Sequence, residues 1–355
     1  DTDWTDAVTR NALSQIHNIS ASGGFGNTTY RISANSRTKE GIVNNTGFEQ
    51  FNSRANITTK ALNDKLKISF NASFTQRQSQ FGNPLVMKYA TLFNPTAPIY
   101  TAGSEFFPGN SGDVIGGYFE TFGLFDSFNP VSIAEQHIWD GERIELNYNM
   151  ALDYSLTDDL SVYFRAANQT SKNDNRKYVP VTALLDGNAL SPTRRGSASF
   201  ENTRYSFKLY EIYGTYNKSF TGFNLNLTGG YSFQQDNFKN RNFGLGDFPS
   251  DVLDFSDNID ASQDLQNAGF ITANSYKGPD NKIIAFFGRL NMVIDDAIYV
   301  NASVRQEGST KLGDGNKWGF FPAFGVGADI NKYAGTDFDT FKIRLGYGET
   351  GSLPG

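Results

Sequence analysis

The sequence predicts an all-β protein, a transmembrane antiparallel β-barrel, and three observations carry the prediction. Polar and apolar residues alternate with a period of two in many separate runs. Short turns and long connections alternate between the runs, which is the loop asymmetry of transmembrane barrels. Aromatic residues make up 14% of the chain although its mean hydropathy is −0.44, as expected for strands with one apolar and one wet face.

The clearest run covers residues 144–154. One face carries Ile144, Leu146, Tyr148, Met150, Leu152 and Tyr154, and the residues between them are mostly polar. After an Asp-rich turn at 157–159 the alternation resumes over 160–166, so the two runs predict a hairpin. Similar runs occupy 66–74, 223–233, 284–294 and 298–304, and about a dozen strands are expected in all.

The predicted connections fall into two classes. Short turns are expected near 24–27, 61–65, 157–159, 219–222 and 295–296, with a slightly longer one near 332–340. Long connections rich in Gly, Asn, Asp and Pro are expected at 77–141, 173–203 and 238–281. Within the first of these, residues 84–93 predict a short helix, because Pro84 suits a first helical turn and Pro95 follows its end.

Composition argues against several other classes of protein. The 355 residues include no Cys and two His, so disulfides and thiolate metal sites are excluded and a catalytic or zinc centre is disfavoured. The net charge is −6 and no Lys/Arg-rich run occurs, so no nucleic-acid partner is expected. No serine-hydrolase, P-loop or zinc-protease motif is present, and we expect the protein not to be an enzyme. The first residues do not form a signal peptide, and we expect the natural chain to begin upstream.

Four segments resemble SusC/RagA-type TonB-dependent transporters. The first is Asn18 to Gly24 with Thr28 to Ser33, and the second runs from Glu40 to Phe48 and into Arg54 to Ile57. The most specific is Asn301 to Arg305 followed by Gly313 to Ala323, which contains Asn-Lys-Trp-Gly-Phe-Phe-Pro-Ala; Phe341 to Gly351 resembles the next strand of the family. Order and spacing agree over nearly the whole chain, although Glu307 stands where the family usually has Asp.

The resemblance implies that residues 1–355 are a partial β-barrel domain, about half of a barrel with about 22 strands around a plugged lumen. Its long extracellular loops would be 77–141, 173–203, 238–281 and 306–319. The implied function is TonB-dependent import of oligosaccharides or peptides across the outer membrane of a Gram-negative bacterium. The implied partners are a SusD-like surface lipoprotein, outer-membrane lipid, and TonB, which would bind through an N-terminal region that this sequence does not contain.

Candidate site residues follow from the two expected faces and from the loops. Seven cations occupy positions expected to face the lumen: Arg31, Arg54, Lys67, Arg165, Arg289, Arg305 and Arg344. As ligand-binding candidates we select two of these and five loop aromatics: Arg165, Arg305, Phe106, Tyr118, Phe119, Phe122 and Trp139. Lumen solvation and packing within the loops remain the simpler roles for these residues.

Two further features have candidate roles. Trp318 is expected to anchor the barrel at a membrane interface. An acidic segment with Asp254, Asp257, Asp260 and Asp264 offers possible Ca²⁺ ligands, but its spacing does not match an EF-hand, so a solvated loop and no cofactor are expected. A passive porin or adhesin barrel, or a secreted carbohydrate-binding β-protein, remains as the alternative to the transporter.

Overall fold

The computed structural model describes residues 1–101, 115–120, 128–189, 191, 194–252, 258–334 and 341–353. Within them, thirteen antiparallel strands form one sheet. The strands are β1 (Ser14–Phe25), β2 (Thr28–Glu40), β3 (Gly47–Ala61), β4 (Leu66–Gln80), β5 (Ile138–Ser155), β6 (Leu160–Val179), β7 (Ser197–Phe220), β8 (Phe223–Gly246), β9 (Thr272–Lys277), β10 (Asn281–Ile294), β11 (Ile298–Ser309), β12 (Trp318–Asp329) and β13 (Lys342–Gly348).

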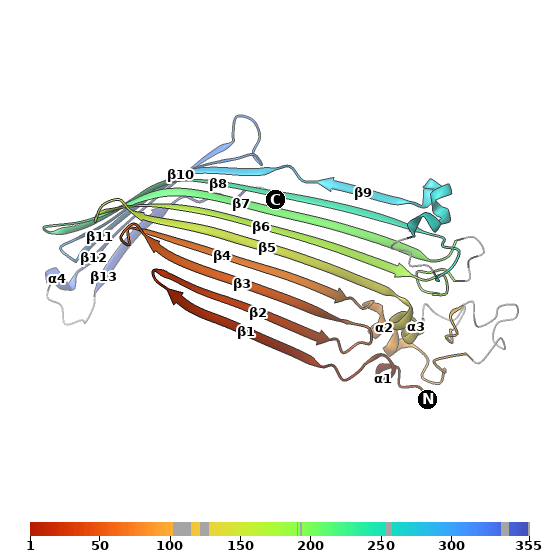
Figure 1. Cartoon of the computed structure of the whole chain (residues 1–355). Coiled ribbons are helices and arrows are strands. Elements are labelled where there is room, and N and C mark those ends of the chain that lie inside the picture. Colours follow the sequence, from red (N-terminus) through yellow and green to blue (C-terminus); the bar gives the residue numbers. More distant parts are fainter. Residues whose placement is uncertain are drawn as a thin grey trace.

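The strands lie in the order in which the chain makes them. Each strand from β1 to β8 pairs with the next, and β8 then pairs with β10, which leads through β11 and β12 to β13. The short β9 pairs with the far end of β8, so that β9 and β10 follow the same neighbour one after the other. Figure 1 shows one curved sheet in which β1 and β13 are the two edges and do not meet. The predicted all-β antiparallel class is confirmed, although the sheet is not closed.

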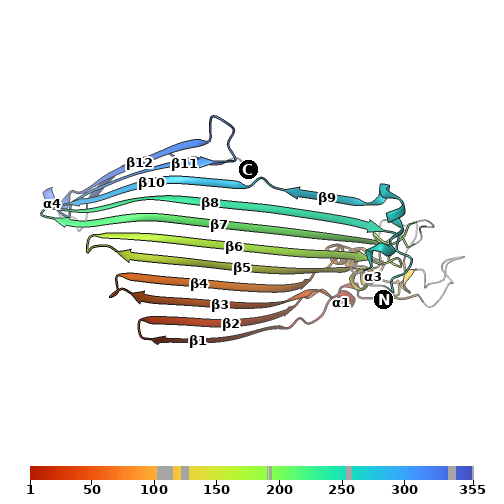
Figure 2. The same ribbon diagram turned by 45° about the horizontal axis from the view of Figure 1, so that its top comes forward.

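The five predicted short turns are also confirmed, since each joins two strands at the same end of the sheet (Figure 2), whereas most of the longer connection near 332–340 lies outside the described residues. All of them except the turn at 157–159 contain residues with positive φ, which suit the twist of tight hairpins. At the turn between β10 and β11, Asp295 and Asp296 have φ of 48° and 49°. Asp tolerates this region better than most residues because its short side chain can bond locally.

The strands run beyond the alternating segments and into the ranges expected to be loops. The sheet includes β4 as far as Gln80, β6 as far as Val179 and β8 as far as Gly246. In these extensions both faces carry polar residues, as in the segment from Gln76 to Gln80. A period-two signal in hydropathy therefore disappears although the backbone pairing continues.

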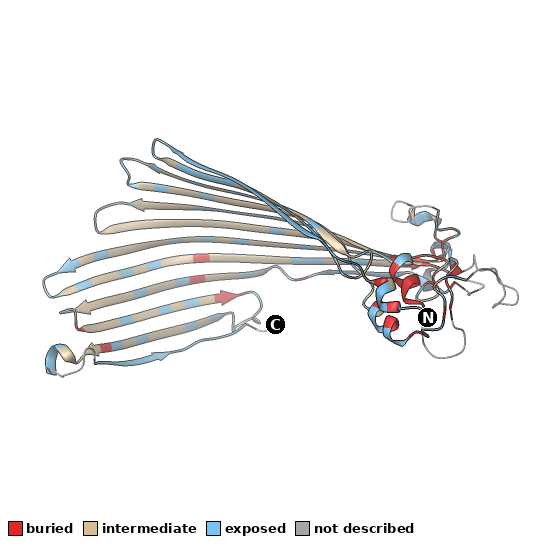
Figure 3. Ribbon diagram, turned by 90° about the horizontal axis from the view of Figure 1, so that it is seen from below, coloured by how far each residue is buried: buried red, intermediate tan, exposed pale blue. Residues whose placement is uncertain are grey.

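Small helices gather at the end of the sheet opposite the short turns. These are α1 (Trp4–Val8), α2 (Leu85–Leu92) and α3 (Pro130–Gln136), and Figure 1 shows them side by side. The predicted helix at 84–93 is confirmed as α2. The buried residues concentrate here, as Figure 3 shows, whereas most of the sheet is half-buried or exposed. Among the described residues, no helix is long and apolar enough to cross a membrane.

Candidate functional site on the polar face of the sheet

Register separates the residues of the sheet into two faces, because residues directly opposite each other in neighbouring strands point to the same side. One such row runs through Phe70, Met150, Ala166, Tyr210 and Phe233. No residue is skipped within any ladder between β1 and β8, so the separation holds along the whole length of these strands. We call the side with this row the apolar face and the other side the polar face.

The apolar face collects the residues that the alternation predicts for it. Leu146 and Met150 lie there and are exposed, at 40% and 37%. Exposed apolar side chains gathered on one face mark a surface that can contact lipid or another protein.

The polar face carries the cations expected to face the lumen. In the ladders of their strands, all seven share a side with Asn, Ser and Thr residues. Two hydrogen-bonded chains of amides lie on the same face. In the first, Asn52 Nδ2 donates to Asn35 Oδ1 at 3.0 Å and Thr75 donates to Asn52. In the second, Asn291 Nδ2 donates to Asn226 Oδ1 at 3.1 Å.

Aromatic rings form a distinct row on this polar face. Tyr163 and Tyr213 are directly opposite each other on β6 and β7, and their rings stack with centroids 4.8 Å apart and an interplanar angle of 15°. Phe287 of β10 continues the row, with its centroid 6.3 Å from that of Tyr213. Gly230 of β8 lies between them in register, and a Cβ there would come within 2.4 Å of the Tyr213 Cβ and 2.7 Å of the Phe287 ring. The glycine therefore makes the space in which the rings meet.

Arg165 places a charged group beside this aromatic row. Its guanidinium lies 5.5 Å from the centroid of the Tyr163 ring and 6.0 Å from that of Tyr213, and it forms a salt bridge with Asp153. Stacked rings offer flat apolar faces, and the ion pair offers charged donors and acceptors. Such a combination can hold sugar rings, peptide groups or another segment of protein.

Arg305 lies on the polar face of β11, directly opposite Phe287. Its Nε donates to Glu307 at 2.7 Å. The two predicted cations, Arg165 and Arg305, are thus at opposite ends of one aromatic row. The sequence analysis missed Tyr213, Phe287, Asp153 and Gly230, although the aromatics among them stand at polar positions of the alternation, which is a readable signal.

Two of the predicted loop aromatics are packed into the core that α1, α2 and α3 form with the adjoining loops, which we call the loop layer. Tyr118 is 8% exposed, its hydroxyl donates to Glu135 at 2.6 Å, and burial raises the pKa of that hydroxyl. Phe119 packs against the same core, which is built by α1, α2 and α3. Phe106 and Phe122 lie outside the described residues.

Trp139 is found at the start of β5. Its ring packs against Phe81 with centroids 5.6 Å apart, and the Lys177 ammonium lies 6.0 Å from it. The ring lies at the junction of sheet and helices. Cargo contact by these loop residues stays a prediction.

Burial also shifts the pKa values of Glu120 and His137 in the loop layer. Burial raises the pKa of Glu120 to about 7, although the Asn129 backbone N–H, which donates to it at 2.9 Å, favours the charged form. Burial, with the nearby Lys177 charge, lowers the pKa of His137 to about 4, and His137 Nδ1 lies 2.9 Å from the amide of Asn83. His137 is therefore neutral at ordinary pH.

The predicted anchor, Trp318, begins β12 at the end of the apolar face. Its ring covers Gly308 of β11 and stacks with Phe286 at a centroid distance of 6.5 Å. A Trp at the border of an apolar surface suits a membrane interface. Anchoring stays a prediction.

In the acidic segment, one of the four Asp residues forms an ion pair and a hydrogen bond with other residues of the chain. Asp264 is 2% exposed and forms an ion pair with Arg194 at 2.7 Å, and it also accepts from the Gly246 N–H. Asp254 and Asp257 lie outside the described residues. In the described part of the chain, no group of three or more His, Asp or Glu side chains could hold a metal ion. The expectation that the segment binds no cofactor stays a prediction.

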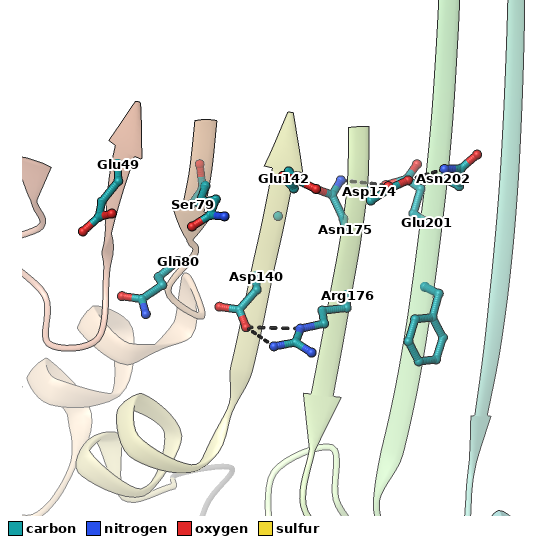
Figure 4. A pocket seen from close by; sticks show the side chains of 13 residues that line it. Glu49, Ser79, Gln80, Asp140, Glu142, Asp174, Asn175, Arg176, Glu201 and Asn202 are labelled. Carbon is teal, nitrogen blue, oxygen red and sulfur yellow. Dashed lines mark hydrogen bonds and ion pairs between the residues drawn. The ribbon is translucent and has the colours of Figure 1, made fainter. Parts of the chain in front are cut away.

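A groove of about 780 Å³ crosses the helix-proximal ends of β3 to β7 (Figure 4). Arg176 donates from Nε and a terminal nitrogen to Asp140, at 3.3 and 3.1 Å, and Asn175 donates to Glu201 at 3.3 Å. The charged side chains that line the groove are Glu49, Asp140, Glu142, Asp174, Arg176 and Glu201. Five carboxylates against one guanidinium make the groove acidic.

Comparison with curated proteins relates the chain to one class of protein. Over 99% of its length it is 24% identical to TonB-dependent receptor P3 of Formosa agariphila and 23% identical to TonB-dependent receptor SusC of Bacteroides thetaiotaomicron. TonB-dependent receptor P26 of Formosa agariphila is 28% identical over 99% of the chain. The chain is a homologue of one part of the TonB-dependent receptors. It spans about a third of the length of these relatives, 34%, 35% and 34%.

Solved structures of a peptide transporter and of an import receptor have the same fold as this chain. The RagAB peptide transporter matches 98% of the chain with a TM-score of 0.75 at 18% identity, and the chain covers 38% of that protein. The ferric-catecholate import receptor Fiu of E. coli matches 96% of the chain with a TM-score of 0.52 at 11% identity, with 55% of that protein covered. No family model matches the chain. The resemblance to SusC/RagA-type receptors is thus confirmed.

Proposed function

We propose that this chain forms part of the barrel wall of a TonB-dependent transporter in the outer membrane of a Gram-negative bacterium. The observation that carries the proposal is the two-faced antiparallel sheet, in a chain whose sequence is similar to TonB-dependent receptors over 99% of its length. In this proposal the apolar face meets lipid and the polar face lines the lumen. The function is passage of a solute, and it needs no bond-breaking chemistry.

The cargo that we propose is an oligosaccharide or a peptide. The aromatic row with Arg165 and Asp153 supports both, because rings stack on sugars and the ion pair bonds carboxylates, amides or hydroxyls. One similar structure is described as a peptide transporter, which favours peptides. We also propose a SusD-like lipoprotein as partner, and TonB as the source of force.

Energised uptake tests this proposal. Cells that make the intact polypeptide would be given labelled peptides or labelled oligosaccharides, with and without a protonophore. A TonB-dependent transporter loses uptake when the proton-motive force collapses, whereas a passive porin does not. Uptake that persists with the protonophore would favour the porin and reject the proposal.

Detergent phase partitioning distinguishes the proposed membrane barrel from the alternative, a secreted carbohydrate-binding protein. A chain whose exposed Leu146 and Met150 face lipid enters the detergent phase, whereas a secreted binding protein remains in the aqueous phase. Recovery in the aqueous phase without detergent would therefore reject the barrel itself.

The aromatic row is tested by the substitution Arg165→Gln. If Arg165 bonds cargo, the half-saturation concentration for uptake rises roughly tenfold to a hundredfold, the worth of one hydrogen bond from a charged group. The matched control is Arg31→Gln, which removes a cation from the same face on β2, far from the rings. Equal effects of the two substitutions would show that only the general charge of the polar face matters.

A further inference from the structure

A row of cations crosses four neighbouring strands. Lys172, Arg204, Lys239 and Lys277 are directly opposite one another on β6, β7, β8 and β9. We call these four residues the cationic row. They lie on the apolar-face side of the sheet, and all except the half-buried Lys172 are exposed. Like charges directly opposite each other destabilise a sheet, so this arrangement favours a bound anion.

The protein compensates only part of this charge. Lys172 forms an ion pair with Asp174, and Lys277 lies 3.9 Å from Asp280. In the part of the chain that the structure describes, no carboxylate lies within ion-pair distance of Arg204 or Lys239. Three further exposed cations flank the row on the same face: Lys208, Arg241 and Lys282.

The row begins at the border of the apolar face. On β5 the position opposite Lys172 is Ile144, the last apolar residue of that strand's run. On β7 the row stands six residues beyond Tyr210 on the same face. With a strand rise of ~3.4 Å per residue and a tilt of about 40°, Arg204 stands about 15 Å above Tyr210, but it lies only two strand spacings, about 10 Å, from Ile144.

This height matches a particular layer of a membrane. The polar interface of a bilayer is about 5–8 Å deep on each side of the hydrocarbon. A row that begins beside Ile144 and is at most about 10 Å above it at Arg204 therefore lies at the level of the lipid phosphates. Long Lys and Arg side chains can bend back toward the phosphates.

The row also lines a groove with neutral donors. The groove has a volume of about 460 Å³ and contains Lys172, Arg204 and Lys239. Thr170 and Ser206, directly opposite each other one step closer to the apolar border, line it as well. Ammonium, guanidinium and hydroxyl groups together form the donor set that phosphate oxygens accept from.

We propose that the cationic row binds the phosphorylated headgroup of a glycolipid in the outer leaflet. The proposal rests on the proposed function, because it places the apolar face in a membrane. Continuity with that face argues for a lipid, since acyl chains would lie against Tyr210 and its neighbours while the phosphates meet Arg204 and Lys239. The opposite charge of headgroup and row supplies the attraction.

The test uses the intact polypeptide in detergent and the double substitution R204Q/K239Q. Native mass spectrometry would measure binding of a bis-phosphorylated diglucosamine lipid. We expect about 30-fold weaker binding than in the unaltered protein, since each cation near an anionic surface contributes about sixfold. The matched control, R31Q/R54Q, removes the same charge from the polar face and should change binding less than about threefold.

Each outcome decides a different point. Equal losses in both double variants would mean non-specific attraction and would overturn the proposal, as would unchanged binding in R204Q/K239Q. If inorganic phosphate or the deacylated glycolipid binds as tightly as the lipid, the row is a site for free phosphates and the lipid assignment is wrong. Failure of the protein to enter the detergent phase would reject the proposed function instead.

Discussion

Substitution of Gly230 by alanine tests the packing of the aromatic row. The added methyl group would meet the Tyr213 Cβ at 2.4 Å, the Ile212 carbonyl oxygen at 2.7 Å and the Phe287 ring at 2.7 Å. One of these atoms is backbone, so a side-chain rotation alone cannot relieve the contact. Overpacking of this kind costs about 1–3 kcal/mol.

The neighbouring Gly229 supplies the matched control. It lies on the opposite face of the same strand, and a Cβ there would meet only the Phe287 carbonyl oxygen, at 3.9 Å. Alanine in a strand is otherwise favoured over glycine by roughly 0.5–1 kcal/mol. The difference between Gly230→Ala and Gly229→Ala cancels that preference, and it should be about 1–3 kcal/mol in free energy of unfolding.

The assay is equilibrium unfolding of the intact polypeptide in detergent, followed by near-ultraviolet circular dichroism. The stacked Tyr163 and Tyr213 rings contribute to that signal, so Gly230→Ala should also reduce it in the folded state. Equal stability of the two variants, with an unchanged aromatic spectrum, would show that Gly230 is not what allows the rings to meet.

Two further predictions concern buried carboxyl groups outside the strands, Glu120 and Asp264. Because the folded-state pKa of Glu120 is raised from 4.5 to about 7, its contribution to the stability of the loop layer is full below pH 4.5 and falls by about 3 kcal/mol as the pH rises through 7, whereas the lowered pKa of His137 acts in the opposite sense between pH 4 and 6.5. Glu120→Gln should remove the Glu120 contribution, so that the α3 amides become better protected at pH 8 relative to pH 5 than in the unaltered protein, measured by hydrogen exchange. Arg194→Gln leaves the buried Asp264 carboxylate unpaired and should destabilise its loop by about 3–5 kcal/mol, measured by limited proteolysis, whereas Lys177→Gln breaks an exposed pair and should cost less than about 1 kcal/mol.

Contrary results would be informative for both. An exchange profile that keeps its pH dependence in Glu120→Gln would assign that dependence to another group. Proteolysis that is equally fast in the Arg194 and Lys177 variants would show that the burial of Asp264 does not set the stability of its loop.

The alternation of polar and apolar residues predicted the sheet well, because the two faces of a strand differ in polarity wherever they meet different surroundings. The run from Ile144 to Tyr154 carries this signal and lies within β5. The signal vanished where both faces are polar, so the extension of β6 to Val179 could not be predicted. There the strand is maintained by backbone pairing, which leaves no hydropathy pattern.

The site was predicted only in part, since alternation gives the face of a residue but not its neighbour on the next strand. Arg165 and Arg305 were placed on the polar face from the sequence. Their link through Tyr213 and Phe287 depends on the pairing register between strands that are distant in the chain. Turn length fixes the register within hairpins, but the long connections leave it open.

The unbroken register of the ladders constrains how such a wall can change its length. If β8 lost one residue before Leu225, every later side chain of that strand would turn to the other side. Asn226 would then lie on the apolar face, and Leu225 and Leu227 would lie on the polar face. A hairpin can lose residues in pairs without this exchange, and a connection between strands can lose any number. Insertions and deletions among homologous sequences should therefore fall in the connections, or inside strands only in even steps.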